Sequence, residues 1–137
     1  MKVAISGGFD PIHKGHIQLI REAKKLGDEL IVIANNDNWL TKKKGKPFMP
    51  EDERKIILEE MRSVDKVILT NHKPDDPDVS VCNELRQVKP DLFANGGDRK
   101  EDNIPEYQLC DELGIKMVFN VGGGKIQSSS WLISANR

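Results

Sequence analysis

The sequence predicts an α/β fold, a single doubly wound, Rossmann-like domain built on a five-stranded parallel sheet. Short apolar runs alternate with stretches of helical periodicity along the whole chain, which is typical of helices packed on both faces of a parallel sheet. No internal repeat, low-complexity segment or linker interrupts this alternation. The 137 residues suit one domain covering residues 1–137, which is long enough to bury a core without disulfides.

Five short apolar runs are expected to form the strands. The run 29–34, ELIVIA, is rich in β-branched residues, as a strand buried on both faces of a parallel sheet is. These runs cover residues 2–6, 29–34, 65–69, 91–94 and 115–121.

The segments between these runs carry helix signals. In residues 16–26 apolar side chains recur at close to helical spacing, and Gly27 is a plausible stop. Acidic residues at 51–53 suit the positive end of a helix dipole. We therefore expect helices over 16–26, from 50 onward, over 79–88, over 105–113 up to Gly114, and from Ser128, with a polar, lysine-rich loop over 35–50.

Composition and charge exclude several classes of protein. No apolar run approaches the roughly 18 residues that span a bilayer, and residues 1–6 resemble a strand more than a signal peptide. We therefore expect a cytoplasmic protein with no membrane partner. The net charge of −1 argues against a nucleic-acid partner, although it permits a cleft that binds a small anion. Cys82 and Cys110 lack the spacing of a zinc knuckle or disulfide framework, which favours two buried, reduced thiols.

The loop after the first predicted strand has the features of a phosphate-binding site. Gly7 and Gly8 would let the backbone approach a ligand closely, because neither has a Cβ atom. His13 and His16 are three residues apart at the start of a helix, so their side chains share a face. Free amides at a helix start attract anions, and the two imidazoles add donors.

Other interpretations of this loop remain open. Asp10, His13 and His16 could together ligate zinc. A dinucleotide-binding loop is disfavoured because the spacing G-x-G-x-x-G is absent. Gly124-Lys125 lacks the upstream glycine of a P-loop, so that motif is rejected.

The complete string from Gly7 to His16, GGFDPIHKGH, resembles the signature of the cytidylyltransferase-like nucleotidyltransferases. This family includes glycerol-3-phosphate cytidylyltransferases and heptose-phosphate adenylyltransferases. Three further segments resemble family motifs in the expected order, so the resemblance covers nearly the whole chain. They are the lysine run 42–46 with the helix start 50–54, the turn 95–98, and the segment 126–130.

The resemblance implies a set of site residues. Residues expected to act in catalysis are His13, His16, Lys44, Lys46 and Arg54, with the histidines on the α- and β-phosphates, the lysines clamping the phosphates and Arg54 binding a phosphate bidentately. Residues expected to contact the nucleotide are Gly7, Gly8, Phe9, Asp10, Gly96, Gly97, Asp98, Ser128, Ser129 and Ser130. The sequence departs from the pattern at Lys14, inside the histidine motif, and at Trp131, where some members carry an arginine near the serines.

The resemblance also implies a reaction. A phosphorylated small molecule, either a sugar phosphate or a polyol phosphate, would attack the α-phosphorus of CTP or ATP and release pyrophosphate. Positioning and charge neutralisation supply most of such catalysis. Mg²⁺ is expected with the triphosphate. A nucleotide sensor without catalysis is the main alternative, and a metal-dependent hydrolase is a third. The sequence leaves open the nucleobase, the acceptor, the catalytic lysine within 42–46, and a homodimer.

Overall fold

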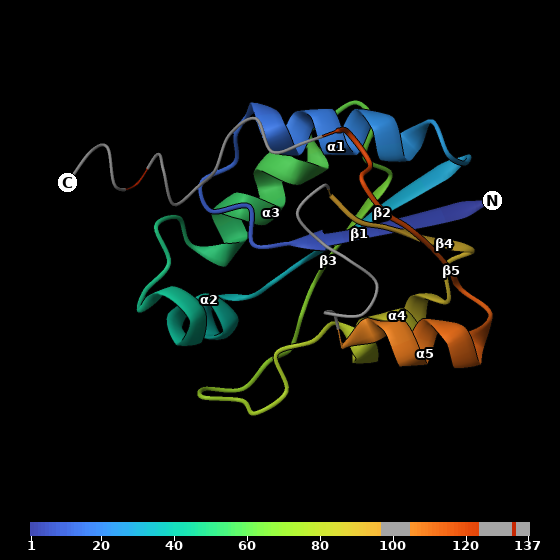
Figure 1. Cartoon of the computed structure of the whole chain (residues 1–137). Coiled ribbons are helices and arrows are strands. Elements are labelled where there is room, and N and C mark those ends of the chain that lie inside the picture. The colour runs from blue at the N-terminus through green and yellow to red at the C-terminus, as the bar shows by residue number, and fades with distance from the viewer. Residues whose placement is uncertain (97–104, 124–132, 134–137) are drawn as a thin grey trace.

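The computed structural model describes residues 1–96, 105–123 and 133. Within them, five parallel strands form one sheet in the order β3-β2-β1-β4-β5 (Figure 1). This confirms the predicted α/β class and the parallel sheet. The strands are β1 (Lys2–Gly7), β2 (Glu29–Ala34), β3 (Lys66–Leu69), β4 (Leu92–Ala94) and β5 (Lys116–Val118).

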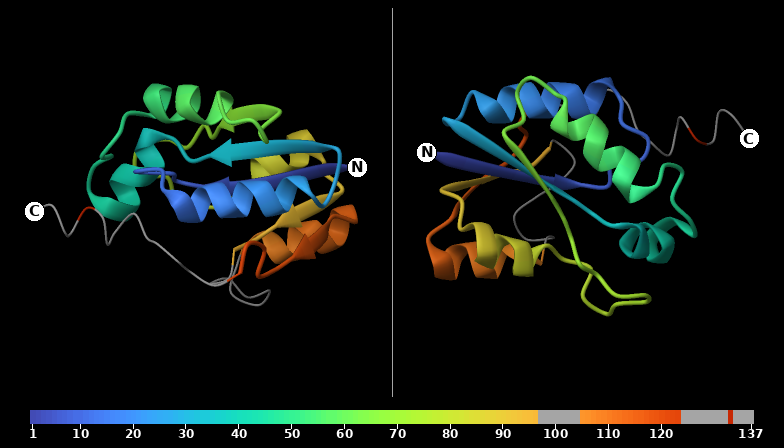
Figure 2. Two further views of the ribbon diagram at one scale, coloured as in Figure 1. Left: turned by 90° about the horizontal axis from the view of Figure 1, so that it is seen from above. Right: turned by 180° about the vertical axis from the view of Figure 1, so that it is seen from behind.

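Helices cover both faces of the sheet. α1 and α3 lie on one face and α4 and α5 on the other, whereas α2 lies beyond the carboxyl end of β2 (Figures 1 and 2). Their bounds are α1 (Lys14–Lys24), α2 (Asp37–Lys44), α3 (Glu51–Glu59), α4 (Cys82–Val88) and α5 (Glu106–Leu113). No helix in the described residues is long and apolar enough to cross a bilayer.

The two faces of the sheet enclose two apolar clusters. β1 supplies both, because successive side chains of a strand point to opposite faces. Val3 and Ile5 pack with Ile20 of α1 and Leu58 of α3, whereas Ala4 belongs to the cluster on the α4 and α5 side. Burial on both faces explains why the strands read as nearly continuous apolar runs. This rigid frame fixes where the loops at the strand ends begin.

The structure corrects the expected loop over 35–50, because Asp37–Lys44 forms α2. The side-chain oxygen of Asn36 accepts the N–H of Trp39 at 3.0 Å, which caps the helix. Leu40 is fully buried and anchors it. Local capping and one buried contact therefore outweigh the weak apolar periodicity of this segment.

Gly27 is required for a different reason from the predicted helix stop. α1 ends at Lys24, and a Cβ atom on Gly27 would lie 2.6 Å from the carbonyl oxygen of Met1. That oxygen accepts the N–H of Asp28 at 2.8 Å, so it cannot move aside without losing this bond. Gly114, by contrast, ends α5 as predicted, with a left-handed φ of 71°.

The two cysteines are free thiols. Cys110 is buried, and burial raises its pKa to about 11, whereas Cys82 is only partly buried. Some predicted features lie outside the described residues, namely the last helix and the candidate residues Gly97, Asp98, Ser128, Ser129 and Ser130.

The strand order places a switch point at β1. The chain proceeds from β1 to β2 on one side and later returns to β4 on the other. Loops that leave the carboxyl ends of such strands diverge, and ligands of open parallel sheets bind there. The histidine loop follows β1, and Asn95 and Gly96 follow β4, so both border this point.

Candidate active site

His13 and His16 form a reciprocal cap at the start of α1. The Nδ1 atom of His13 accepts the N–H of Gly15 at 3.1 Å, and Nδ1 of His16 accepts the N–H of His13 at 3.1 Å. This is a capping box in which two imidazoles replace the usual hydroxyl and carboxylate. The two rings stack with their centroids 3.8 Å apart.

The cap determines where the imidazole protons lie. Nδ1 of each ring accepts a hydrogen bond, so a neutral ring carries its proton on Nε2. Burial, together with the nearby His13 and the positive charge of Lys44, lowers the pKa of His16 to about 3. His16 is therefore a neutral Nε2–H donor at neutral pH. A donor of this kind at a helix N-terminus suits a phosphate oxygen.

Phe9 packs against His16, and Gly7 and Gly8 leave room for neighbouring side chains. The Phe9 ring is 2% exposed and lies 4.9 Å from the His16 ring. A Cβ atom on Gly7 would come within 3.2 Å of the Phe9 ring, and one on Gly8 within 3.1 Å of Leu40. These glycines therefore make room for the protein's own side chains. A ligand contact from Phe9 would have to come from its backbone.

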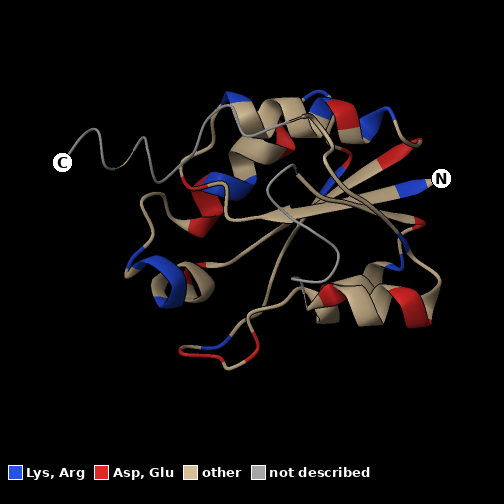
Figure 3. Cartoon of the chain, viewed as in Figure 1, with Lys and Arg blue, Asp and Glu red and all other residues tan. Residues whose placement is uncertain are grey.

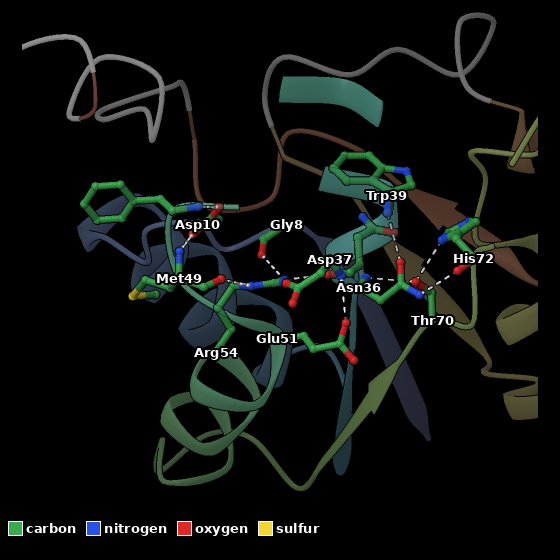
Figure 4. Close-up of polar contacts among 12 residues, drawn as sticks. Gly8, Asp10, Asn36, Asp37, Trp39, Met49, Glu51, Arg54, Thr70 and His72 are labelled. Atoms are coloured by element: carbon green, nitrogen blue, oxygen red, sulfur yellow. Dashed lines mark hydrogen bonds and ion pairs between the residues drawn. The ribbon is translucent and has the colours of Figure 1, made fainter. Parts of the chain in front are cut away.

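Asp10 connects the histidine loop to the lysine-rich segment. Its buried carboxylate accepts the N–H groups of Phe48 and Met49, each at 2.6 Å (Figure 4). Both oxygens thus face backbone amides, which argues against the alternative in which Asp10 ligates zinc. Across residues 1–96 and 105–123, no three His, Cys, Asp or Glu side chains are grouped as metal ligands.

Arg54 occupies a different environment from the one expected of a phosphate ligand. Its side chain is fully buried, and its donors bind the carbonyl oxygens of Met49 (3.0 Å), Gly8 (2.9 Å) and Asn35 (Figure 4). A fourth bond joins Nη2 to the Asp37 carboxylate at 2.8 Å. Four of its five N–H groups are engaged, so this arrangement does not offer the predicted bidentate phosphate contact.

The lysines of the 42–46 run differ in their surroundings. Lys42 donates to the carbonyl oxygen of Asp76 at 2.6 Å, and Lys43 lies over the Trp39 ring, 5.9 Å from its centroid. Lys44 ends α2, is exposed, and lies near enough to His16 to contribute to its lowered pKa. Lys46 is exposed in the turn that follows. Positive charge therefore gathers at the end of α2 (Figure 3).

Sequence reasoning missed the residues that organise this region. Asp37 is the only charged partner of Arg54 within the described residues, and Asn36 caps α2 while its amide donates to the carbonyl oxygen of His72 at 2.9 Å. The string Asn35-Asn36-Asp37 after a buried strand is a helix-start signal that could have been recognised. The partners of Arg54 had no such signal, because three of them are backbone carbonyls.

Comparison with known proteins identifies the family. Residues 4–120 match the cytidylyltransferase-like family, which is most of the chain. The chain belongs to this family of nucleotidyltransferases.

Individual relatives share much of the length. The FAD synthase of Aciduliprofundum boonei is 37% identical over 117 residues, 85% of this chain and 74% of that protein. The bifunctional protein HldE of Desulfatibacillum aliphaticivorans is 32% identical over 93% of this chain, but the match spans only 25% of that protein. The crystal structure of a lipopolysaccharide core biosynthesis protein from Thermoplasma volcanium superposes with a TM-score of 0.70 at 31% identity, covering 87% of this chain and 94% of that one.

Proposed function

We propose that this nucleotidyltransferase is an adenylyltransferase that transfers AMP from ATP to FMN and releases pyrophosphate. The observation that carries the reaction class is the stacked pair of histidines capping α1, with Lys44 nearby. The choice of ATP and FMN is supported by relatives named FAD synthase, such as those of Ferroglobus placidus and Pyrococcus abyssi, at 41% and 34% identity.

The proposed mechanism is a single in-line displacement. A phosphate oxygen of the acceptor forms a bond to the α-phosphorus as the bond from that phosphorus to the bridging oxygen breaks, and the electron pair leaves with pyrophosphate. Nε2–H of His16, with its partner His13, would donate to the phosphate oxygens that gain charge. Lys44, with Lys46, would neutralise the two polyanions and hold them together.

Mg²⁺ enters this proposal as part of the substrate, bound to the triphosphate. The surroundings fit this role, because the Asp10 carboxylate is occupied by two amides and the last turn of α2 carries lysines. Mg²⁺ keeps several waters and commonly binds through substrate phosphates. We therefore expect pyrophosphate release to depend on a divalent cation.

A sugar phosphate is the second candidate acceptor. The match to HldE covers 93% of this chain, more than the match to the Aciduliprofundum FAD synthase. The superposed structure of the lipopolysaccharide core biosynthesis protein is consistent with the same acceptor class.

The test is pyrophosphate release by the full chain with Mg²⁺, measured for ATP and CTP against FMN, a heptose phosphate and glycerol phosphate. The proposal expects the highest kcat/KM for ATP with FMN, and FAD as the product. Greater turnover with CTP, or with a sugar or polyol phosphate, would replace this assignment. Nucleotide binding without turnover of any pair would instead support a sensor.

A further inference from the structure

We infer that Asp10, Asp37 and Arg54 form a clamp that holds both ends of the lysine segment, residues 37–49, against the histidine loop. In this assignment they are positioning residues and do not touch the substrates. The inference rests on the proposed function only for its activity readout.

Both ends of the lysine segment are attached to the same buried group. At its start, the Asp37 carboxylate pairs with Nη2 of Arg54 at 2.8 Å. At its end, the Met49 carbonyl oxygen accepts from Nε of Arg54 at 3.0 Å. The N–H of Met49 donates to Asp10 at 2.6 Å, so this peptide is held on both sides. Residues 41–46 between these anchors are all exposed.

The clamp also reaches the histidine loop and β2. Nη1 of Arg54 donates to the carbonyl oxygens of Gly8 and Asn35, which follow β1 and β2. A fully buried guanidinium is stable only when its donors are satisfied, so displacement of one partner is resisted by all the others. Arg54 therefore fixes the distance between the loop that carries His13 and the segment that carries Lys44.

The consequence for catalysis is preorganisation. With its ends fixed, the segment can move only between its anchors, so any closing motion of Lys44 starts beside the histidine loop. Small errors of placement at a reacting centre are costly, because a displacement of about 1 Å can reduce rates about 100-fold. The clamp would remove that error.

The test is a double-mutant cycle between Asp10→Asn and Lys44→Ala. Asparagine keeps one acceptor oxygen but turns an NH₂ group toward the second backbone amide. We expect D10N to lower kcat/KM about 10- to 100-fold in the wild-type background and to have little further effect when Lys44 is already alanine. Multiplicative effects would overturn the inference, because they would mean that Asp10 acts on the substrate independently of the lysine.

A second measurement follows the clamp without activity. Hydrogen exchange at the Phe48 and Met49 amides should be slow in the wild-type protein and at least 10-fold faster in D10N, while exchange in α1 and the sheet is unchanged. If the D10N variant fails to fold, Asp37→Asn, at a carboxylate that is 35% exposed, should accelerate exchange at Met49 through Arg54. Unchanged exchange at Met49 in a folded variant would overturn the clamp.

Asp52→Asn is the matched control. Asp52 is exposed in the first turn of α3, two residues before Arg54, so the substitution removes the same charge without touching the clamp. It should leave both exchange and kcat/KM unchanged. If the wild-type protein turns over no acceptor, the proposed function fails, and the exchange measurement still decides whether the clamp exists.

Discussion

At the scale of single residues, each histidine of the loop has two tasks that use different atoms. Nδ1 caps the helix, and the proposed role in catalysis belongs to Nε2. Mutation to alanine removes both and cannot separate them. Asparagine at position 16 can separate them, because its Oδ1 lies as many bonds from Cβ as Nδ1 of histidine does.

We predict that His16→Ala and His16→Asn both lower turnover by ~10²–10³, the scale for losing one donor in the transition state. Only the alanine variant should also lose stability, by about 1 kcal/mol, because it loses the bond from the N–H of His13. Steady-state pyrophosphate release and urea unfolding check the two effects. Turnover within threefold of wild type in either variant would contradict the assigned role.

The neutral state of His16 predicts a pH effect on stability. Its folded-state pKa, lowered to about 3 by burial and by His13 and Lys44, lies below the ordinary value of 6.5. The unfolded chain therefore takes up a proton below pH 6.5 that the folded protein does not accept until about pH 3. Its stabilising contribution is complete above pH 6.5 and is lost as the pH falls toward 3.

Two measurements check this effect. The ring-nitrogen chemical shifts of His16 should stay those of an Nε2–H tautomer between about pH 5 and 8. His16→Asn should lose less stability than the wild-type protein when unfolding is compared at about pH 7.5 and about pH 5, because its amide does not titrate. A His16 titration near pH 6.5 would contradict the geometry described for the cap.

At the scale of elements, the lysine segment shows what the sequence could and could not predict. The five strands and helices α1, α3, α4 and α5 were predicted from local signals such as apolar runs, an acidic first turn and Gly114. α2 was missed because it is held by a cap and by Leu40, against a background of lysines. The carbonyl partners of Arg54 were missed because tertiary contacts with the backbone leave no trace in side-chain patterns.

The lysine segment is predicted to close over bound triphosphate, with Lys44 more important than Lys46. Exposed like charges repel one another until an anion arrives. Lys44→Ala should lower kcat about 10-fold or more, and Lys46→Ala should act mainly on the KM of one substrate. Limited proteolysis within 38–48 should slow when MgATP is added. Equal cleavage with and without nucleotide, and unchanged kinetics in both variants, would show that the run is only a solvated face.

At the scale of the whole molecule, the packing contact at Gly27 and the candidate site lie at opposite ends of the sheet. Gly27 and Met1 meet at the amino end of the strands, whereas the histidine loop and the lysine segment lie beyond the carboxyl ends. The close contact at Gly27 lies at the amino ends of the two neighbouring strands β1 and β2 and touches no candidate site residue. This separation allows stability and ligand binding to be altered independently.

We therefore predict opposite behaviour for Gly27→Ala and His16→Asn. A Cβ atom at position 27 would lie 2.6 Å from the Met1 carbonyl oxygen, so the backbone must shift and the free energy of unfolding should fall. An overpacking cost of about 1–3 kcal/mol is typical. The gain in stability on adding MgATP at about 100 times its Kd, about 2.7 kcal/mol, should be unchanged, because it depends only on binding to the folded state.

His16→Asn should keep its unliganded stability near neutral pH but gain less from the same MgATP concentration, because it has lost a donor to the phosphates. Thermal unfolding of the three proteins with and without MgATP measures both quantities. A reduced MgATP gain in Gly27→Ala would mean that the amino end of the sheet is coupled to the site. An undiminished gain in His16→Asn would mean that Nε2 of His16 does not contact bound nucleotide.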